Sequence, residues 1–88
     1  MKMIVCILQD SDKDKASDAL NENGYSVTII PSTGAYFRRG NATMIAGVED
    51  DQVDDAISII REAVKREDEP ELKRATLFVI NVDQYSKV

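Results

Sequence analysis

The residues best suited to chemistry lie in one short stretch, residues 32–41, with the sequence STGAYFRRGN. Tyr36 and Phe37 can stack on a nucleotide base, and each stacked ring contributes about 1–3 kcal/mol. Arg38 and Arg39 follow directly and can neutralise phosphate, because a guanidinium makes charge-assisted, often bidentate hydrogen bonds. The stretch therefore predicts a nucleotide site. The residues alone leave one alternative open, a surface loop whose rings pack on a neighbouring subunit.

Three more residues of this stretch fit the same interpretation. Asn41 carries both a donor and an acceptor for a base edge. Gly34 and Gly40 have no Cβ, so the backbone can approach a ligand closely there. The chain as a whole is acidic, with 16 Asp and Glu against 11 Lys and Arg and a formal net charge of -5. This balance argues against general nucleic-acid binding, which depends mainly on Lys and Arg.

Composition also argues against the commonest kinds of catalytic site. The chain has no histidine, which removes the most frequent general base and transition-metal ligand. Its one cysteine, Cys6, lies inside the apolar run 3–8 and is interpreted as a buried structural thiol. These two observations leave catalysis open but exclude its easiest routes. We expect no metal site and no cofactor.

A string of alternating acidic residues, Asp10, Asp12 and Asp14, invites comparison with a calcium-binding loop. An EF-hand loop that starts at Asp10 needs Gly at position 15 and Glu at position 21. The chain has Lys15 and Asn21 there. We therefore interpret the string as the start of a helix, with an Asp or Ser as its N-cap and acidic residues in its first turn.

Hydrophobic periodicity and turn residues predict six elements in the order β-α-β-β-α-β. This order is typical of the ferredoxin-like α+β fold, in which two helices cover one face of a four-stranded antiparallel sheet. We expect one domain over residues 1–88. The predicted strands are residues 2–9, 25–31, 41–49 and 75–82, and the predicted helices are residues 11–24 and 51–66.

Each predicted helix has its own apolar stripe and end signals. Gly24 is expected to stop the first helix, and Gly47 inside the third strand suggests a bulge or a close backbone approach. The acidic residues at 50–55 favour the N-terminal end of the second helix. The expected stripes are Ala16, Ala19, Leu20 and Asn23 in the first helix and Val53, Ile57, Ile60 and Val64 in the second.

The predicted strands are apolar on both faces. Residues 3–8, 29–30, 44–46 and 77–80 are continuous apolar runs, whereas a sheet with one solvated face should alternate apolar and polar residues. We therefore expect another copy of the chain to cover the second face. No apolar run reaches the roughly 20 residues needed to span a bilayer, so we expect a cytoplasmic protein without membrane insertion.

Two other functions are found on this topology, and neither fits. An acylphosphatase holds phosphate in the loop after the first strand, but residues 9–12 (QDSD) are acidic here. An RRM stacks RNA bases on aromatic residues of its central strands, but residues 41–46 contain none. The charged run 66–74 is interpreted as a solvated connection, with a wall of an intersubunit ligand site as the alternative.

Three segments together resemble one family. MKMIVCILQDSD, STGAYFRRGNATMIAGVEDDQVDDAISII and ATLFVINVDQY are similar to segments of the PII-like cyclic di-AMP receptors. The resemblance implies a homotrimer of ferredoxin-like subunits, with cyclic di-AMP bound in clefts between neighbours. It implies that the loop at residues 32–41 reports occupancy to an unidentified protein target, and it implies no catalysis.

Carried over position by position, the resemblance implies a ligand site and some departures from the family pattern. Tyr36 stands where the family has Phe, Phe37 stands where it has Leu, and Arg38 occupies a position that is often basic. Ala35 replaces the second glycine of a Gly-Gly pair. The implied ligand-binding residues are Thr28, Gly34, Ala35, Tyr36, Phe37, Arg38, Asn41 and Gly47.

Two further positions and one connection also differ from the family. Gly24 and Ser26 stand where known receptors tend to carry Asn and Arg, and the connection at residues 66–74 is short. Each lost hydrogen-bond partner can cost about 1–3 kcal/mol where the ligand is buried. The alternatives to cyclic di-AMP are another nucleotide or small anion, such as ATP or ADP, and a partner-binding module that takes no nucleotide.

Overall fold

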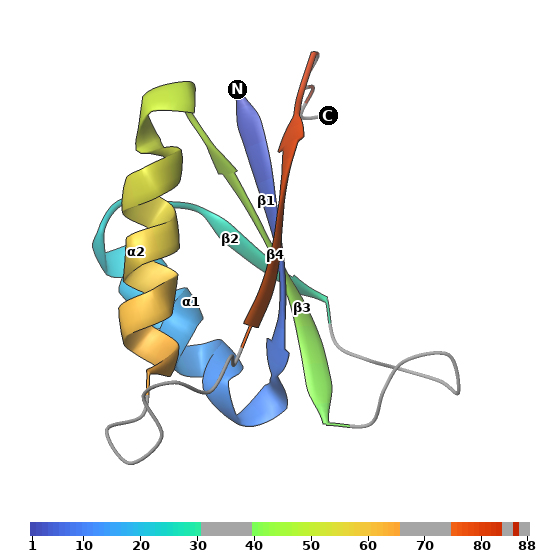
Figure 1. Cartoon of the computed structure of the whole chain (residues 1–88), viewed down its shortest axis with the longest axis vertical. Coiled ribbons are helices and arrows are strands. Elements are labelled where there is room, and N and C mark those ends of the chain that lie inside the picture. Colours follow the sequence, from blue (N-terminus) through green and yellow to red (C-terminus); the bar gives the residue numbers. More distant parts are fainter. Residues whose placement is uncertain (31–39, 66–74, 84–85, 87–88) are drawn as a thin grey trace.

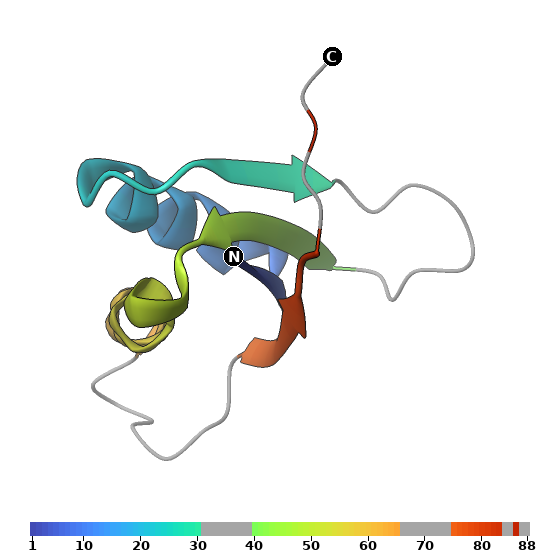
Figure 2. The ribbon, with the colours of Figure 1, turned by 90° about the horizontal axis from the view of Figure 1, so that it is seen from above.

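A single antiparallel sheet with two helices on one side forms the part of the chain that the computed structural model describes, residues 1–30, 40–65, 75–83 and 86 (Figure 1). The strands lie in the order β2-β3-β1-β4, so β2 and β4 form the two edges (Figure 2). The predicted ferredoxin-like α+β fold is confirmed. The strands are β1 (Lys2–Gln9), β2 (Val27–Ile30), β3 (Asn41–Val48) and β4 (Ala75–Asn81), and the helices are α1 (Lys13–Glu22) and α2 (Val53–Val64).

Both helices start through a 3-10 turn, which the periodicity does not predict. The turn η1 (Asp10–Asp12) leads into α1, and η2 (Asp50–Gln52) leads into α2. Asp12 is the N-cap residue of α1, as predicted, but its side chain makes no capping hydrogen bond. Glu49 forms a capping box with Gln52, and its backbone N–H donates to Oε1 of Gln52 at 3.0 Å. The start of α2 is therefore fixed locally by a reciprocal side-chain contact.

The predicted stop of α1 at Gly24 is confirmed. Gly24 has φ of +87°, in the left-handed region that side chains with a Cβ rarely adopt. Its backbone N–H donates to the carbonyl of Asn21 at 3.1 Å, and that of Tyr25 donates to the carbonyl of Leu20 at 3.0 Å. These bonds satisfy carbonyl groups that the end of a helix leaves without a partner inside the helix.

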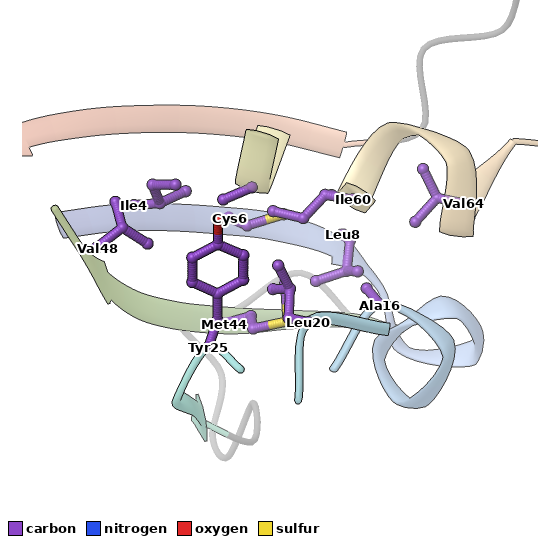
Figure 3. Packing of buried hydrophobic residues seen from close by; sticks show 11 residues of the cluster. Ile4, Cys6, Leu8, Ala16, Leu20, Tyr25, Met44, Val48, Ile60 and Val64 are labelled. Atoms are coloured by element: carbon purple, nitrogen blue, oxygen red, sulfur yellow. The ribbon is translucent and has the colours of Figure 1, made fainter. Parts of the chain in front are cut away.

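The core lies between the helices and the helix-facing side of the sheet (Figure 3). The α1 stripe is shifted from its predicted position, because Asn23 is exposed and Ala19 half-buried, while Ser17 is buried. In α2, two of the four predicted positions are fully buried and the other two pack against the core at its edge. The buried core residues are Ile4, Cys6, Leu8, Ala16, Leu20, Tyr25, Met44, Val48, Ala56, Ile60 and Val64.

Tyr25 corrects the prediction for the second strand. The sequence predicts that residues 25–31 are extended, but β2 starts at Val27 and Tyr25 lies in the connection before it. The ring of Tyr25 is 8% exposed and packs between the sheet and the helices, among the residues in Figure 3. An aromatic side chain at this point fills the core rather than pairing in the sheet.

Candidate functional site

The face of the sheet that the helices leave uncovered is apolar. Side chains alternate along a strand, so the buried residues of β1 point toward the helices and Met3, Val5 and Ile7 point the other way. Val5 is flanked by Ile45 of β3 and Phe78 of β4. We call this side the open face. Large side chains on it are strongly exposed: Ile7 (37%), Ile30 (41%), Phe78 (52%) and Ile80 (45%).

The prediction that both faces of the sheet are apolar is therefore confirmed. The exposed residues come from β1, β2 and β4, so the apolar surface crosses the sheet rather than lying on one strand. Large exposed apolar patches on a small domain mark interaction surfaces. The open face has the properties of a surface that another molecule covers.

Three of the predicted ligand residues lie on this face, along β2 and β3. Thr28 is exposed and pairs with Ile45. Gly47 follows Ile45 by two residues, a separation of about 7 Å along the strand. Asn41 precedes Ile45 by four residues, a separation of about 13 Å. The fold thus places Thr28 and Gly47 close together on the open face. Asn41 lies on the same face, at the end of β3 next to the loop.

Gly47 does not mark a bulge, although its position inside a strand suggests one. The register between β1 and β3 runs unbroken from Lys2 opposite Val48 to Gln9 opposite Asn41, and Gly47 pairs with Met3. A Cβ at Gly47 would meet the Cε of Met1 at 3.5 Å, an ordinary contact. The side chain of Met1 therefore lies over Gly47, which contributes no side chain of its own to the open face.

Asn41 stands at the base of the predicted nucleotide loop, and the backbone there is anchored. Gly40 has φ of +89°, and its carbonyl accepts a 2.6 Å hydrogen bond from the backbone N–H of Asp10. Nζ of Lys13 lies 3.2 Å from Oδ1 of Asp10 and donates to the carbonyl of Asp10 at 3.3 Å. The loop base is therefore bonded to the turn that starts α1, which fixes where Asn41 enters the sheet.

Five predicted ligand residues belong to the loop between β2 and Gly40. Gly34, Ala35, Tyr36, Phe37 and Arg38 lie outside the described residues, as does the charged connection at 66–74. Their role in ligand binding stays a prediction from the sequence.

The buried thiol of Cys6 belongs to the core and not to the open face. Cys6 is fully buried, and burial raises its pKa from 9.0 to about 11. A thiol with such a pKa is almost fully protonated at neutral pH and is a poor nucleophile. The interpretation of Cys6 as a structural residue is consistent with both observations.

Other kinds of site are not seen in the described part of the chain. Its Cys, Asp and Glu side chains form no group of three that would hold a metal ion. Neither of its helices has the length and apolar character needed to cross a membrane.

The match to a protein family decides the identity of the chain. The family described as "Cyclic-di-AMP receptor" matches residues 1–70, which include β1, β2, β3, both helices and the loop between β2 and β3. The chain belongs to the cyclic-di-AMP receptor family. Membership confirms the PII-like resemblance drawn from the sequence, and it places the chain among receptor proteins rather than in a family of enzymes.

A solved structure supports the fold of this receptor-family chain. It is the crystal structure of a functionally unknown protein from Pediococcus pentosaceus ATCC 25745, with 27% sequence identity and a TM-score of 0.77. The similarity covers 99% of this chain and 96% of that chain. The same fold therefore extends over nearly the full length of both proteins.

One contact that connects the elements around the site is not predicted by the sequence. The hydroxyl of Tyr25 donates to Oδ2 of Asp55 at 2.7 Å, across 30 residues of sequence. This bond, together with the partial burial of the ring, raises the pKa of Tyr25. The sequence gives only a weak signal for this contact. Tyr25 is equally well explained as a strand residue, and Asp55 as part of the acidic first turn of α2.

Proposed function

We propose that this receptor-family chain binds cyclic di-AMP in clefts between the subunits of a homotrimer and reports occupancy through the loop at residues 32–41. The observation that carries the proposal is the family match over residues 1–70, which spans this loop and both strands that hold it. The loop supplies two rings for the bases and two arginines for the phosphates.

The arrangement of the sheet supports a site that includes the open face. Thr28, Asn41 and Gly47 share that face, and an exposed apolar surface surrounds them. A nucleotide on an isolated subunit would remain largely open to water at this position. A second copy packed on the open face would bury the apolar side chains and form the other wall of the cleft, which strengthens polar contacts by excluding water.

The proposed relay follows from the anchor at the loop base. Gly40 connects the loop to Asn41 and, through its carbonyl, to the backbone of Asp10 at the start of η1. A ligand that contacts both the loop side chains and Asn41 would hold the loop in one position relative to this anchor. The loop would then present its other side chains to a protein target in a different arrangement from that of the free receptor.

Another nucleotide remains the second candidate, because the chain departs from the family at specific positions. Ala35 adds a methyl group where the family has glycine, and Ser26 replaces an Arg. Gly24 replaces an Asn, and its φ of +87° gives this glycine a structural reason to be there. ATP or ADP would need fewer contacts from these positions than a ligand with two bases.

Isothermal titration calorimetry with cyclic di-AMP, ATP, ADP and cyclic di-GMP separates the candidates. The proposal expects cyclic di-AMP to bind tightest of the four. Tighter binding of ATP or ADP would favour the second candidate, and silence towards all four would favour a module that binds only a protein partner. Sedimentation velocity on the same samples checks whether the chain is a trimer.

A further inference from the structure

A shallow groove lies on the opposite side of the molecule from the open face, in the crease between α1 and α2. It is lined by Ala19 of α1 and by Ser58, Ile59, Glu62 and Ala63 of α2. The two helices pack against each other along this crease (Figure 1). Because Ala19 and Ala63 are small, the crease is not filled, and the half-buried Ile59 forms part of its apolar floor.

The rim of this groove, which we call the helix groove, carries more acidic than basic side chains, with Lys65 as a basic residue at the end of α2. Glu62 lines the groove itself, and Glu22 lies one helical turn beyond Ala19. Asp55 lies one turn before Ile59, with one carboxylate oxygen bonded to Tyr25. Lys15 lies one turn before Ala19. Together α1 and α2 carry six acidic and three basic side chains.

An apolar floor with an acidic rim fits one kind of occupant. An amphipathic helix can lay its apolar residues, spaced at i, i+3 and i+4, into a groove of this type. Lys or Arg residues beside that apolar face would then meet Glu22 and Glu62, and complementary charge favours both fast association and the correct partner. A second copy of this chain offers a poor match, because its own helices are acidic.

We propose that the helix groove is the docking site for a basic amphipathic helix of a protein partner. The surface lies on the helical side of the fold, away from Thr28, Asn41 and Gly47, so a partner and a nucleotide can bind at the same time. The inference goes beyond the proposed nucleotide binding and does not depend on it.

The probe is a synthetic Leu/Lys amphipathic peptide of about 14 residues, which as a helix of about 21 Å is slightly longer than α2. The matched control peptide has the same Leu positions and Glu in place of Lys. Each is titrated into the isotope-labelled full chain and followed by two-dimensional NMR. The Leu/Lys peptide is expected to bind and to shift the amide signals of Ala19, Ser58, Ile59, Glu62 and Ala63, whereas the Leu/Glu peptide leaves them in place.

Three variants sharpen the result. Glu62→Lys reverses a rim charge and is expected to weaken binding of the Leu/Lys peptide by about fivefold, since exposed pairs contribute up to about 1 kcal/mol. Ser58→Trp fills the groove and should also weaken binding of the Leu/Lys peptide. Asp54→Lys makes the same charge change on α2 outside the groove and should change affinity by less than about twofold. Circular dichroism checks that each variant is folded.

Several results would overturn the proposal. They are absence of binding by the Leu/Lys peptide, equal binding by the Leu/Glu peptide, or shifts centred on Phe78 and Ile80 of the open face. Equal effects of Glu62→Lys and Asp54→Lys would do so too. Adding cyclic di-AMP to the same labelled sample tests nucleotide binding separately, so the failure of one proposal is distinguishable from the failure of the other.

Discussion

The hydroxyl of Tyr25 lies 2.7 Å from Oδ2 of Asp55 and joins the segment before β2 to the first turn of α2. The two residues meet where the end of α1 turns back toward the sheet. The bond fixes α2 relative to the strand that carries Thr28. This single side-chain contact therefore supports the end of the candidate ligand site that carries Thr28, which lies away from the loop.

Removal of this hydrogen bond should lower stability without opening a large cavity. Tyr25→Phe keeps the ring and leaves Asp55 without the hydroxyl, and we expect the free energy of unfolding to fall by about 1–2 kcal/mol. Urea denaturation measures the change. A double-mutant cycle with Asp55→Ala isolates the pair, because alanine cannot accept the hydrogen bond, and Asp54→Ala is the matched control one residue away. A Tyr25→Phe protein as stable as the parent would contradict the assigned role.

Stability should decline at alkaline pH because Cys6 is buried. Burial raises the pKa of its thiol from 9.0 to about 11, so the native state keeps a proton that the unfolded chain releases. The contribution is complete below about pH 9 and is lost as the pH rises toward 11, by at most about 2–3 kcal/mol. Cys6→Val should flatten this part of the profile, as measured by urea denaturation between pH 8 and 10.5.

Tyr25 contributes to the same decline, because its pKa is also raised, first by the hydrogen bond to Asp55. The combined variant Cys6→Val/Tyr25→Phe should therefore have the flattest profile of the set. Unchanged steepness in both variants would show that other groups cause the decline.

Three glycines should respond differently to alanine. At Gly24 and Gly40 a Cβ would meet no neighbouring atom, but their φ values of +87° and +89° strain any residue with a side chain. Gly24→Ala and Gly40→Ala should therefore each lower the free energy of unfolding by about 1–2 kcal/mol. Gly47 lies in an ordinary strand conformation, and its new Cβ would only contact Met1. Gly47→Ala should be nearly neutral for folding in a thermal melt. Equal losses at all three positions would contradict the backbone explanation.

The open face should control assembly. Phe78 is 52% exposed in the isolated subunit, so Phe78→Lys places a charge on the surface that we expect another copy to cover. Sedimentation velocity at micromolar concentration should show a smaller species than the parent. Asn21→Lys adds the same charge on the helical side, where Asn21 is exposed, and should sediment like the parent. A parent protein that is already monomeric would refute the assembly.

The fold was predictable because its elements carry strong local signals. Apolar runs, Gly24 and the acidic start of α2 all point to the same order of strands and helices, and continuous apolar runs revealed that both faces of the sheet are apolar. The 3-10 turns at Asp10 and Asp50 were not predictable, because a tight first turn has the same residue preferences as the start of an α-helix. The start of β2 was predicted two residues too early, at Tyr25 instead of Val27. An aromatic residue is common both in strands and in the core, so its type does not distinguish the two.

The candidate site was predictable in part. The resemblance implied Thr28, Asn41 and Gly47 as site residues, one position at a time. The register of β2 and β3 places all three on one face of the sheet. Of the two interpretations of Gly47, the bulge was wrong, because the register of β1 and β3 is unbroken. The close approach at Gly47 comes from the side chain of Met1 and not from another backbone segment in the described part of the chain. The bond between Asp10 and Gly40 depends on backbone atoms far apart in sequence, which residue types do not report.

Ligand-site variants should separate anchoring contacts from general attraction. Asn41→Ala removes a hydrogen-bonding side chain and Phe37→Ala removes a ring. Each should weaken the binding of cyclic di-AMP by about 1–3 kcal/mol, or about five- to 150-fold in Kd. Arg39→Ala should weaken it modestly. Arg61→Ala, on the exposed surface of α2, is the matched control and should bind like the parent. Unchanged affinity in the first three variants would refute the proposed site.

The most direct test of the central proposal is calorimetric titration of the full chain with cyclic di-AMP. A homotrimer with one cleft per pair of neighbours predicts saturable binding with about one nucleotide per chain, following the symmetry of a closed ring. Asn41→Ala, titrated beside it, should show clearly weaker binding while remaining folded. Absence of binding heat at two temperatures, up to millimolar cyclic di-AMP and from a chain shown to be folded, would contradict the proposal.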